Sequence, residues 1–78
     1  MRGKAEFTVE PFVDADPGPH VLAAIDEVRK RGFDAEIGPF GTAIAGDAAA
    51  VTEAVGAMLE AARTAGATRV ALQIDFLD

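Results

Sequence analysis

Hydrophobic and polar residues alternate with a period of two in three parts of the chain, which is the pattern of a half-buried β-strand. A further short strand is expected around Ile44. In the first part, Phe7 and Val9 would point to one side of a sheet and the polar residues around them to the other. In the second, Phe33, Ala35 and Ile37 are expected to face inward. Pro11 cannot donate a ladder hydrogen bond, so it should end the first strand. The predicted strands span residues 5–10, 33–37, 42–46 and 68–77.

In the two longer intervening segments, apolar residues recur every three or four positions, as in amphipathic helices. The first helix is expected to begin after an Asp16 cap and to end at Arg31. The second is expected to begin after an Asp47 cap and to end near Ala65. Gly56, in the middle of the second helix, costs about 1 kcal/mol relative to alanine, which suggests that another backbone packs closely there.

This order of elements predicts a single α+β domain over residues 1–78. The short connection between the second and third strands indicates a hairpin, and right-handed crossovers then place the first and third strands in the centre. The result is a ferredoxin-like βαββαβ sandwich, in which a four-stranded antiparallel sheet carries two helices on one face. The other face is expected to be open.

The open face is expected to be acidic, with five carboxylates, no lysine and small residues between the charges. A polar face of this kind is common in antiparallel sheets and can simply be solvated. It can equally be a surface for a ligand or a partner subunit, since small side chains would let a flat ring or another sheet approach. The expected polar residues are Glu6, Thr8, Glu10, Asp34, Glu36, Gln73 and Asp75, and the small ones are Ala43, Ala45 and Ala71.

Composition argues against several function classes. A net charge of −6 disfavours nucleic-acid binding, which depends on cations that neutralise phosphates. The chain has no cysteine and no serine, so we expect neither a thiolate metal site nor a nucleophile paired with its one histidine, His20. We therefore expect no enzyme, and His20 is interpreted as a surface or capping residue. No apolar run approaches the roughly 20 residues of a membrane helix, and we expect a cytoplasmic protein.

Three segments give the sequence a resemblance to the family of small thiamine-binding proteins. They are Glu6-Phe7-Thr8-Val9-Glu10-Pro11, then Gly38-Pro39-Phe40-Gly41-Thr42-Ala43-Ile44-Ala45-Gly46, and Gly66-Ala67-Thr68-Arg69-Val70. The resemblance implies a ferredoxin-like fold and binding of thiamine or its hydroxymethylpyrimidine part without chemistry or cofactor. It also implies a homodimer or homotetramer assembled through the sheet.

The ligand would need hydrogen-bonding groups for its aminopyrimidine and carboxylates or an aromatic face for its thiazolium cation. Thr8 and Thr42 match polar positions of the family. Two of these residues could instead have purely structural roles. The Thr42 hydroxyl could bond the turn backbone, and Phe40 could cover the apolar edge of the core. The predicted ligand-binding residues are Glu6, Thr8, Glu10, Phe40, Thr42 and Gln73. The alternative is a structural or regulatory oligomerisation module that binds another small molecule.

Overall fold

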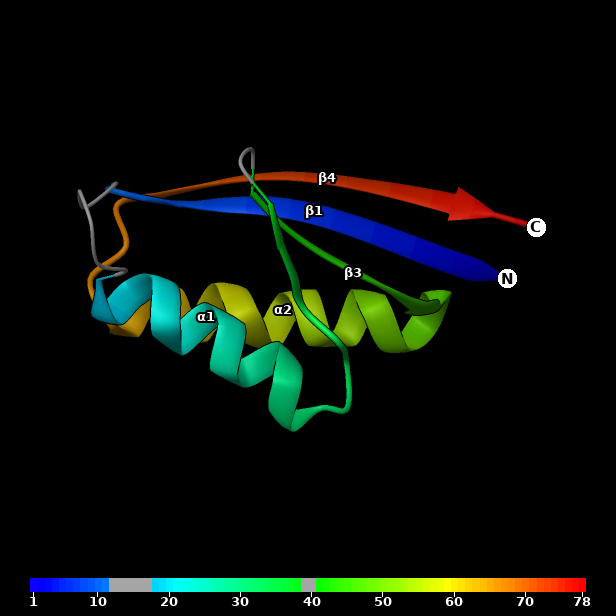
Figure 1. Cartoon of the computed structure of the whole chain (residues 1–78), viewed down its shortest axis with the longest axis horizontal. Coiled ribbons are helices and arrows are strands. Elements are labelled where there is room, and N and C mark those ends of the chain that lie inside the picture. The colour runs from blue at the N-terminus through cyan, green and yellow to red at the C-terminus, as the bar shows by residue number, and fades with distance from the viewer. Residues whose placement is uncertain (12–17, 39–40) are drawn as a thin grey trace.

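The computed structural model describes residues 1–11, 18–38 and 41–78. It contains one sheet and one layer of helices, with the helices on a single face (Figure 1). The elements are β1 (Arg2–Glu10), α1 (Pro19–Lys30), β2 (Glu36–Gly38), β3 (Gly41–Asp47), α2 (Ala48–Thr64) and β4 (Arg69–Leu77). The βαββαβ order confirms the predicted ferredoxin-like fold.

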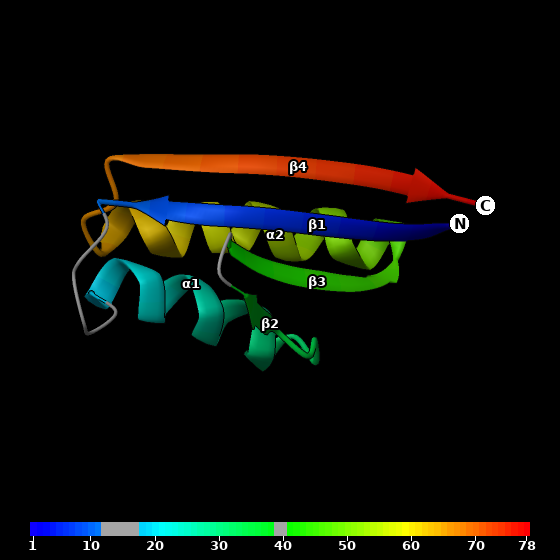
Figure 2. The same ribbon diagram turned by 45° about the horizontal axis from the view of Figure 1, so that its top comes forward.

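The strands are arranged in the order β2-β3-β1-β4, with each neighbouring pair antiparallel. As predicted, β1 and β3 are central and β2 and β4 form the edges. The β1–β4 pairing runs without interruption from Arg2 opposite Leu77 to Glu10 opposite Arg69. Figure 2 shows these two strands side by side along the length of the molecule. The long β1–β4 ladder is therefore the most extended pairing of the sheet.

The core lies between the helix layer and one face of the sheet. Alternate residues of β1 are buried there, because successive strand side chains point to opposite faces. Ile44 from β3, Val28 from α1 and Met58 from α2 fill the space between the layers and are almost completely buried. Phe33 and Ala35 pack against this cluster, as predicted.

The helix boundaries follow local chemistry. The Asp47 side chain accepts a hydrogen bond from the Ala50 N–H at 3.2 Å, which confirms the predicted cap of α2. The prediction for α1 was wrong, because Gly18 is its N-cap and Pro19 its first residue. Proline suits this place, since the first helical N–H has no partner within the helix. Asp16 lies outside the described residues.

Gly56 has no tertiary packing role. A Cβ atom at this position would meet nothing within 4 Å. The expected close approach of another backbone is therefore wrong, and the residue lies on the exposed side of α2.

The edge strand β2 is shorter than predicted. Phe33 packs against β3 at Gly46, where an added Cβ would lie 2.9 Å from the ring. This contact holds the segment before β2 down toward the core, so that only residues 36–38 pair with β3. Ile37 points to the helix side but is 63% exposed, so its predicted burial was wrong.

Candidate ligand site on the open sheet face

The strand register places one row of side chains across the open face of all four strands. Glu6 of β1 lies opposite Gln73 of β4 on one side and opposite Ala43 of β3 on the other. Ala43 in turn lies opposite Glu36 of β2. Directly opposed residues of antiparallel strands point to the same face, with Cβ atoms about 5 Å apart. Glu6 is therefore at the centre of the row.

Two hollows meet at Glu6. One, of about 340 Å³, is lined by Glu6, Phe7, Thr8, Ala71, Leu72 and Gln73. The other, of about 320 Å³, is lined by Lys4, Glu6, Glu36, Ile37, Gly38, Gly41, Thr42 and Ala43. A third, of about 580 Å³, shares Lys4, Glu36 and Ala43 with the second and continues along the end of β3 to Gly46. Because neighbouring hollows share lining residues, we describe the three together as the open-face trough.

The open face of the sheet carries charges of both signs. Lys4 Nζ lies 3.5 Å from Glu6 Oε1, and both side chains are about half exposed. Arg69 Nε lies 3.5 Å from Glu10 Oε2 at the end of the β1–β4 ladder. The expectation of an open face without lysine was wrong, because β1 begins at Arg2 rather than Ala5 and so includes Lys4. Carboxylates and cations together can orient a polar ligand in two directions.

Three of the predicted ligand residues are brought together. Glu6, Thr8 and Gln73 line the same hollow between β1 and β4. The Gln73 amide nitrogen lies 3.5 Å from Asp75 Oδ2, so its carbonyl oxygen is left to accept. A hydroxyl, an amide and a carboxylate are thus available within one hollow.

Two other predicted residues, Glu10 and Thr42, are not part of this group. Glu10 lies at the end of β1, where its backbone carbonyl accepts from the Thr68 N–H at 2.9 Å. Thr42 is opposite Phe7, on the helix-covered face, and is buried. It still lines the second hollow, from the edge near Gly38. Phe40 lies outside the described residues.

Sequence reasoning misjudged His20. Its side chain is buried, and Nε2 lies within hydrogen-bonding distance of the Pro11 carbonyl oxygen, at 2.6 Å. The bond joins the start of α1 to the segment that follows β1, away from the trough. The burial of His20 could have been predicted from the sequence. His20, Ala24 and Val28 recur at intervals of four and so share the buried face of the helix.

Among residues 1–11, 18–38 and 41–78, no group of three histidine, cysteine, aspartate or glutamate side chains is arranged to hold a metal ion. Within the same ranges, no helix has the length and apolar character needed to cross a membrane.

The sequence profile of the family described as thiamine-binding protein matches residues 5–78, which is nearly the whole chain. The chain belongs to the thiamine-binding protein family. This match confirms the family that the sequence resemblance indicated. No curated protein matches the sequence.

Solved structures agree with this family fold. A Bacillus cereus domain of unknown function is 25% identical, with a TM-score of 0.70 over 96% of this chain and 73% of that chain. A hypothetical protein of Methanocaldococcus jannascii is 24% identical, with a TM-score of 0.73 over 99% of this chain and 81% of that chain. A Thermotoga maritima protein with a proposed role in thiamine biosynthesis or salvage is 24% identical, with a TM-score of 0.67 over 96% and 81% of the two chains.

Proposed function

We propose that this protein binds thiamine, or its hydroxymethylpyrimidine part, reversibly and without catalysing a reaction. The observation that carries the proposal is the convergence of Glu6, Thr8 and Gln73 in one hollow of a thiamine-binding protein family member. The role proposed for the similar Thermotoga maritima protein points in the same direction.

The chemistry of the trough suits the two parts of thiamine. The Thr8 hydroxyl and the Gln73 amide offer donors and acceptors for the ring nitrogens and the amino group of a pyrimidine. The Glu6 carboxylate offers a counter-charge for the thiazolium cation of thiamine. Free hydroxymethylpyrimidine has no thiazolium ring and so would not use this interaction. Lys4 already neutralises part of the Glu6 charge, so the cation would compete with Lys4 for this carboxylate.

A second subunit would complete the site. Ligand pockets commonly bury at least 70% of a small ligand, whereas the trough lies open along the sheet. We propose that another copy covers the open face, in a homodimer or homotetramer assembled through the sheet. The small side chains of Ala43, Ala45 and Ala71 on this face would allow its close approach.

Calorimetric titration of the full chain with thiamine, and separately with hydroxymethylpyrimidine, tests the proposal. Wild type should release or absorb heat with at least one of them and show a raised Tm. Thr8→Val should weaken binding about three- to tenfold, the loss expected from one hydrogen bond. Thr52→Val is the matched control, since Thr52 is exposed on α2 and donates to the Ala48 carbonyl. It should bind as wild type does.

If neither titration produces heat and neither compound changes the Tm, the binding proposal is contradicted. An oligomer that persists under those conditions would favour the structural or regulatory module instead. Retention of the oligomer by Thr8→Val, measured by light scattering, would separate the loss of ligand contacts from the loss of assembly. The cytoplasmic location stays a prediction from the sequence.

A further inference from the structure

The Lys4–Glu6 ion pair lies where the hollows of the open-face trough meet. Lys4 lines the hollow that it shares with Glu6 and also the larger hollow that continues along β3 to Gly46. Glu6 in turn lines the hollow toward β4 that contains Thr8 and Gln73. A ligand that extends from the Thr8–Gln73 hollow into the next one therefore passes Glu6 and meets its ion pair with Lys4.

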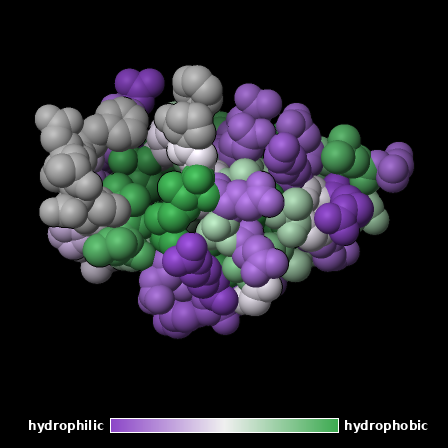
Figure 3. Space-filling view, viewed as in Figure 1, coloured by the Kyte–Doolittle hydropathy of each residue, from purple (hydrophilic) through white to green (hydrophobic). Residues whose placement is uncertain are grey.

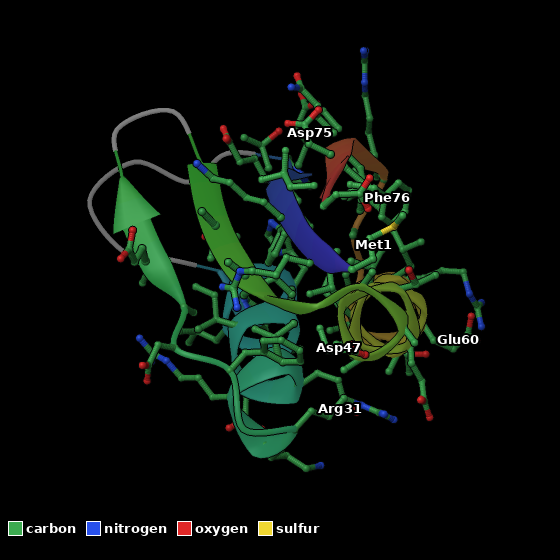
Figure 4. All side chains as sticks on the ribbon, turned by 90° about the vertical axis from the view of Figure 1, so that its right-hand side faces the viewer. Met1, Arg31, Asp47, Glu60, Asp75 and Phe76 are labelled. Carbon is green, nitrogen blue, oxygen red and sulfur yellow. The ribbon has the colours of Figure 1, made fainter. Side chains whose placement is uncertain are left out.

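Carboxylates outnumber Lys4 in this part of the sheet. Among the described residues that line the three hollows, Lys4 is the one cation, and the carboxylates belong to Glu6, Asp34 and Glu36. Asp75 lies opposite Lys4 on β4, and Figure 4 shows it on the side of the sheet away from the helices. Figure 3 shows hydrophilic side chains along this upper side of the molecule. The surplus of negative charge attracts a cationic ligand and repels an anionic one.

Lys4 controls how much of this surplus is available at Glu6. Its ammonium group lies 3.5 Å from the Glu6 carboxylate, and both side chains are about half exposed, so a ligand can reach either partner. A thiazolium cation has to displace the ammonium group before it occupies the carboxylate. Neutral hydroxymethylpyrimidine has no cation to place there, so the pair should matter little to it.

A phosphate ester of thiamine would meet the opposite balance. The phosphate adds almost two negative charges, which face the carboxylates of the trough. Lys4 is then the favourable charged partner among the described residues that line the hollows. One side chain therefore acts in opposite directions on the two ligands, since it opposes the thiazolium and attracts the phosphate.

We propose that Lys4 is the residue that sets the charge selectivity of the trough, by competing with the thiazolium cation for Glu6 and by offering a partner to a phosphate group. This inference rests on the proposed function, the binding of thiamine or hydroxymethylpyrimidine. It goes further by naming the residue that ranks the cationic, neutral and phosphorylated forms of the ligand. The carboxylate surplus favours thiamine over thiamine monophosphate, and Lys4 limits that preference.

Calorimetric titrations of the full chain with thiamine, hydroxymethylpyrimidine and thiamine monophosphate test the proposal. Lys4→Met should bind thiamine about two- to fivefold more tightly than wild type, the range expected for one exposed ion pair. Its affinity for the pyrimidine should change less than about twofold. Wild type should bind the monophosphate more weakly than thiamine, and Lys4→Met should widen that difference. Lys4→Arg restores a cation and should recover most of the wild-type selectivity.

Lys30→Met is the matched control. It makes the same substitution and the same change in net charge, and Lys30 Nζ also pairs with a glutamate, Glu27, at 3.6 Å. This pair lies at the end of α1, on the helix layer. The control should bind all three compounds as wild type does, so it separates a local effect of Lys4 from a change in overall charge.

A double substitution shows whether Lys4 acts through Glu6. In a Glu6→Gln background the carboxylate is absent, so Lys4→Met should lose most of its effect on thiamine affinity. An undiminished effect in the double variant would overturn the proposal. Equal thiamine affinities of Lys4→Met and Lys30→Met, or monophosphate binding to wild type as tight as thiamine binding, would also overturn it. The proposed function itself fails only if wild type binds neither thiamine nor hydroxymethylpyrimidine.

Discussion

His20 Nε2 lies 2.6 Å from the Pro11 carbonyl oxygen, so a buried side chain at the start of α1 is bonded to the backbone just after β1. Removal of the imidazole leaves this carbonyl without that partner and opens space below it. We expect His20→Ala to lower the free energy of unfolding by about 1–3 kcal/mol. Urea denaturation measures the change. Arg29→Ala, at an exposed position of the same helix, is the control, and equal stability of the two variants would contradict this role.

Two glycines should respond in opposite directions to alanine. Gly41 has a φ of +144°, and a Cβ there would lie 2.7 Å from the Phe7 carbonyl oxygen. Gly41→Ala should therefore destabilise the fold by about 1–3 kcal/mol. Gly56→Ala, in open space on α2, should stabilise it by about 0.5–1 kcal/mol. The two urea midpoints should move in opposite directions from that of wild type. A shift of both in the same direction would contradict these environments.

The cap of α2 should depend on a side-chain oxygen at position 47. Asp47→Ala removes the acceptor of the Ala50 N–H and should cost about 0.5–2 kcal/mol. Asp47→Ser keeps an acceptor and should recover most of the loss. The comparison is made by thermal denaturation followed by circular dichroism. Identical Tm values for the alanine and serine variants would show that the hydrogen bond contributes nothing.

The Arg63 guanidinium donates hydrogen bonds to the Glu60 carboxylate and lowers the pKa of that carboxyl below its ordinary value. A lowered pKa favours the folded state above the unfolded pKa, and the benefit is lost as pH falls through the folded pKa. Both groups are fully exposed, so solvent screening should leave stability nearly unchanged. Arg63→Ala should raise the pKa of Glu60 in an NMR titration. Arg2→Ala, on the sheet, should leave it in place.

The topology could be predicted from the sequence because it rests on periodicity and loop length. The alternation around Phe7 and the helix cap at Asp47 each have one physical explanation, and both predictions were confirmed. The start of α1 was predicted wrongly, because an Asp16 cap before Pro17 fits the same helical pattern as the observed Gly18 cap before Pro19. Local sequence rules could not choose between them.

The site was only partly predictable, because its composition depends on where each strand begins and which way each residue faces. Lys4 was missed because a strand can extend beyond its clear alternation. The orientation of Thr42 could have been inferred, since it lies two residues from the buried Ile44 and so shares its face. The exposure of Ile37 could not have been inferred from the sequence, because it depends on how far the helix layer extends under the edge of the sheet. The roles of Glu6, Thr8 and Gln73 in binding stay predictions that the titration will test.

The opposition of Arg2 and Leu77 in the β1–β4 ladder brings the two ends of the chain together at one end of the molecule (Figure 1). A short linker could therefore join Leu77 to Arg2 as an ordinary hairpin, since neighbouring antiparallel strands need only a few residues to connect. New ends could be placed at Gly32, which is exposed and has open space around its Cα. Such a circularly permuted chain would keep every strand pair while changing the order in which the strands are synthesised.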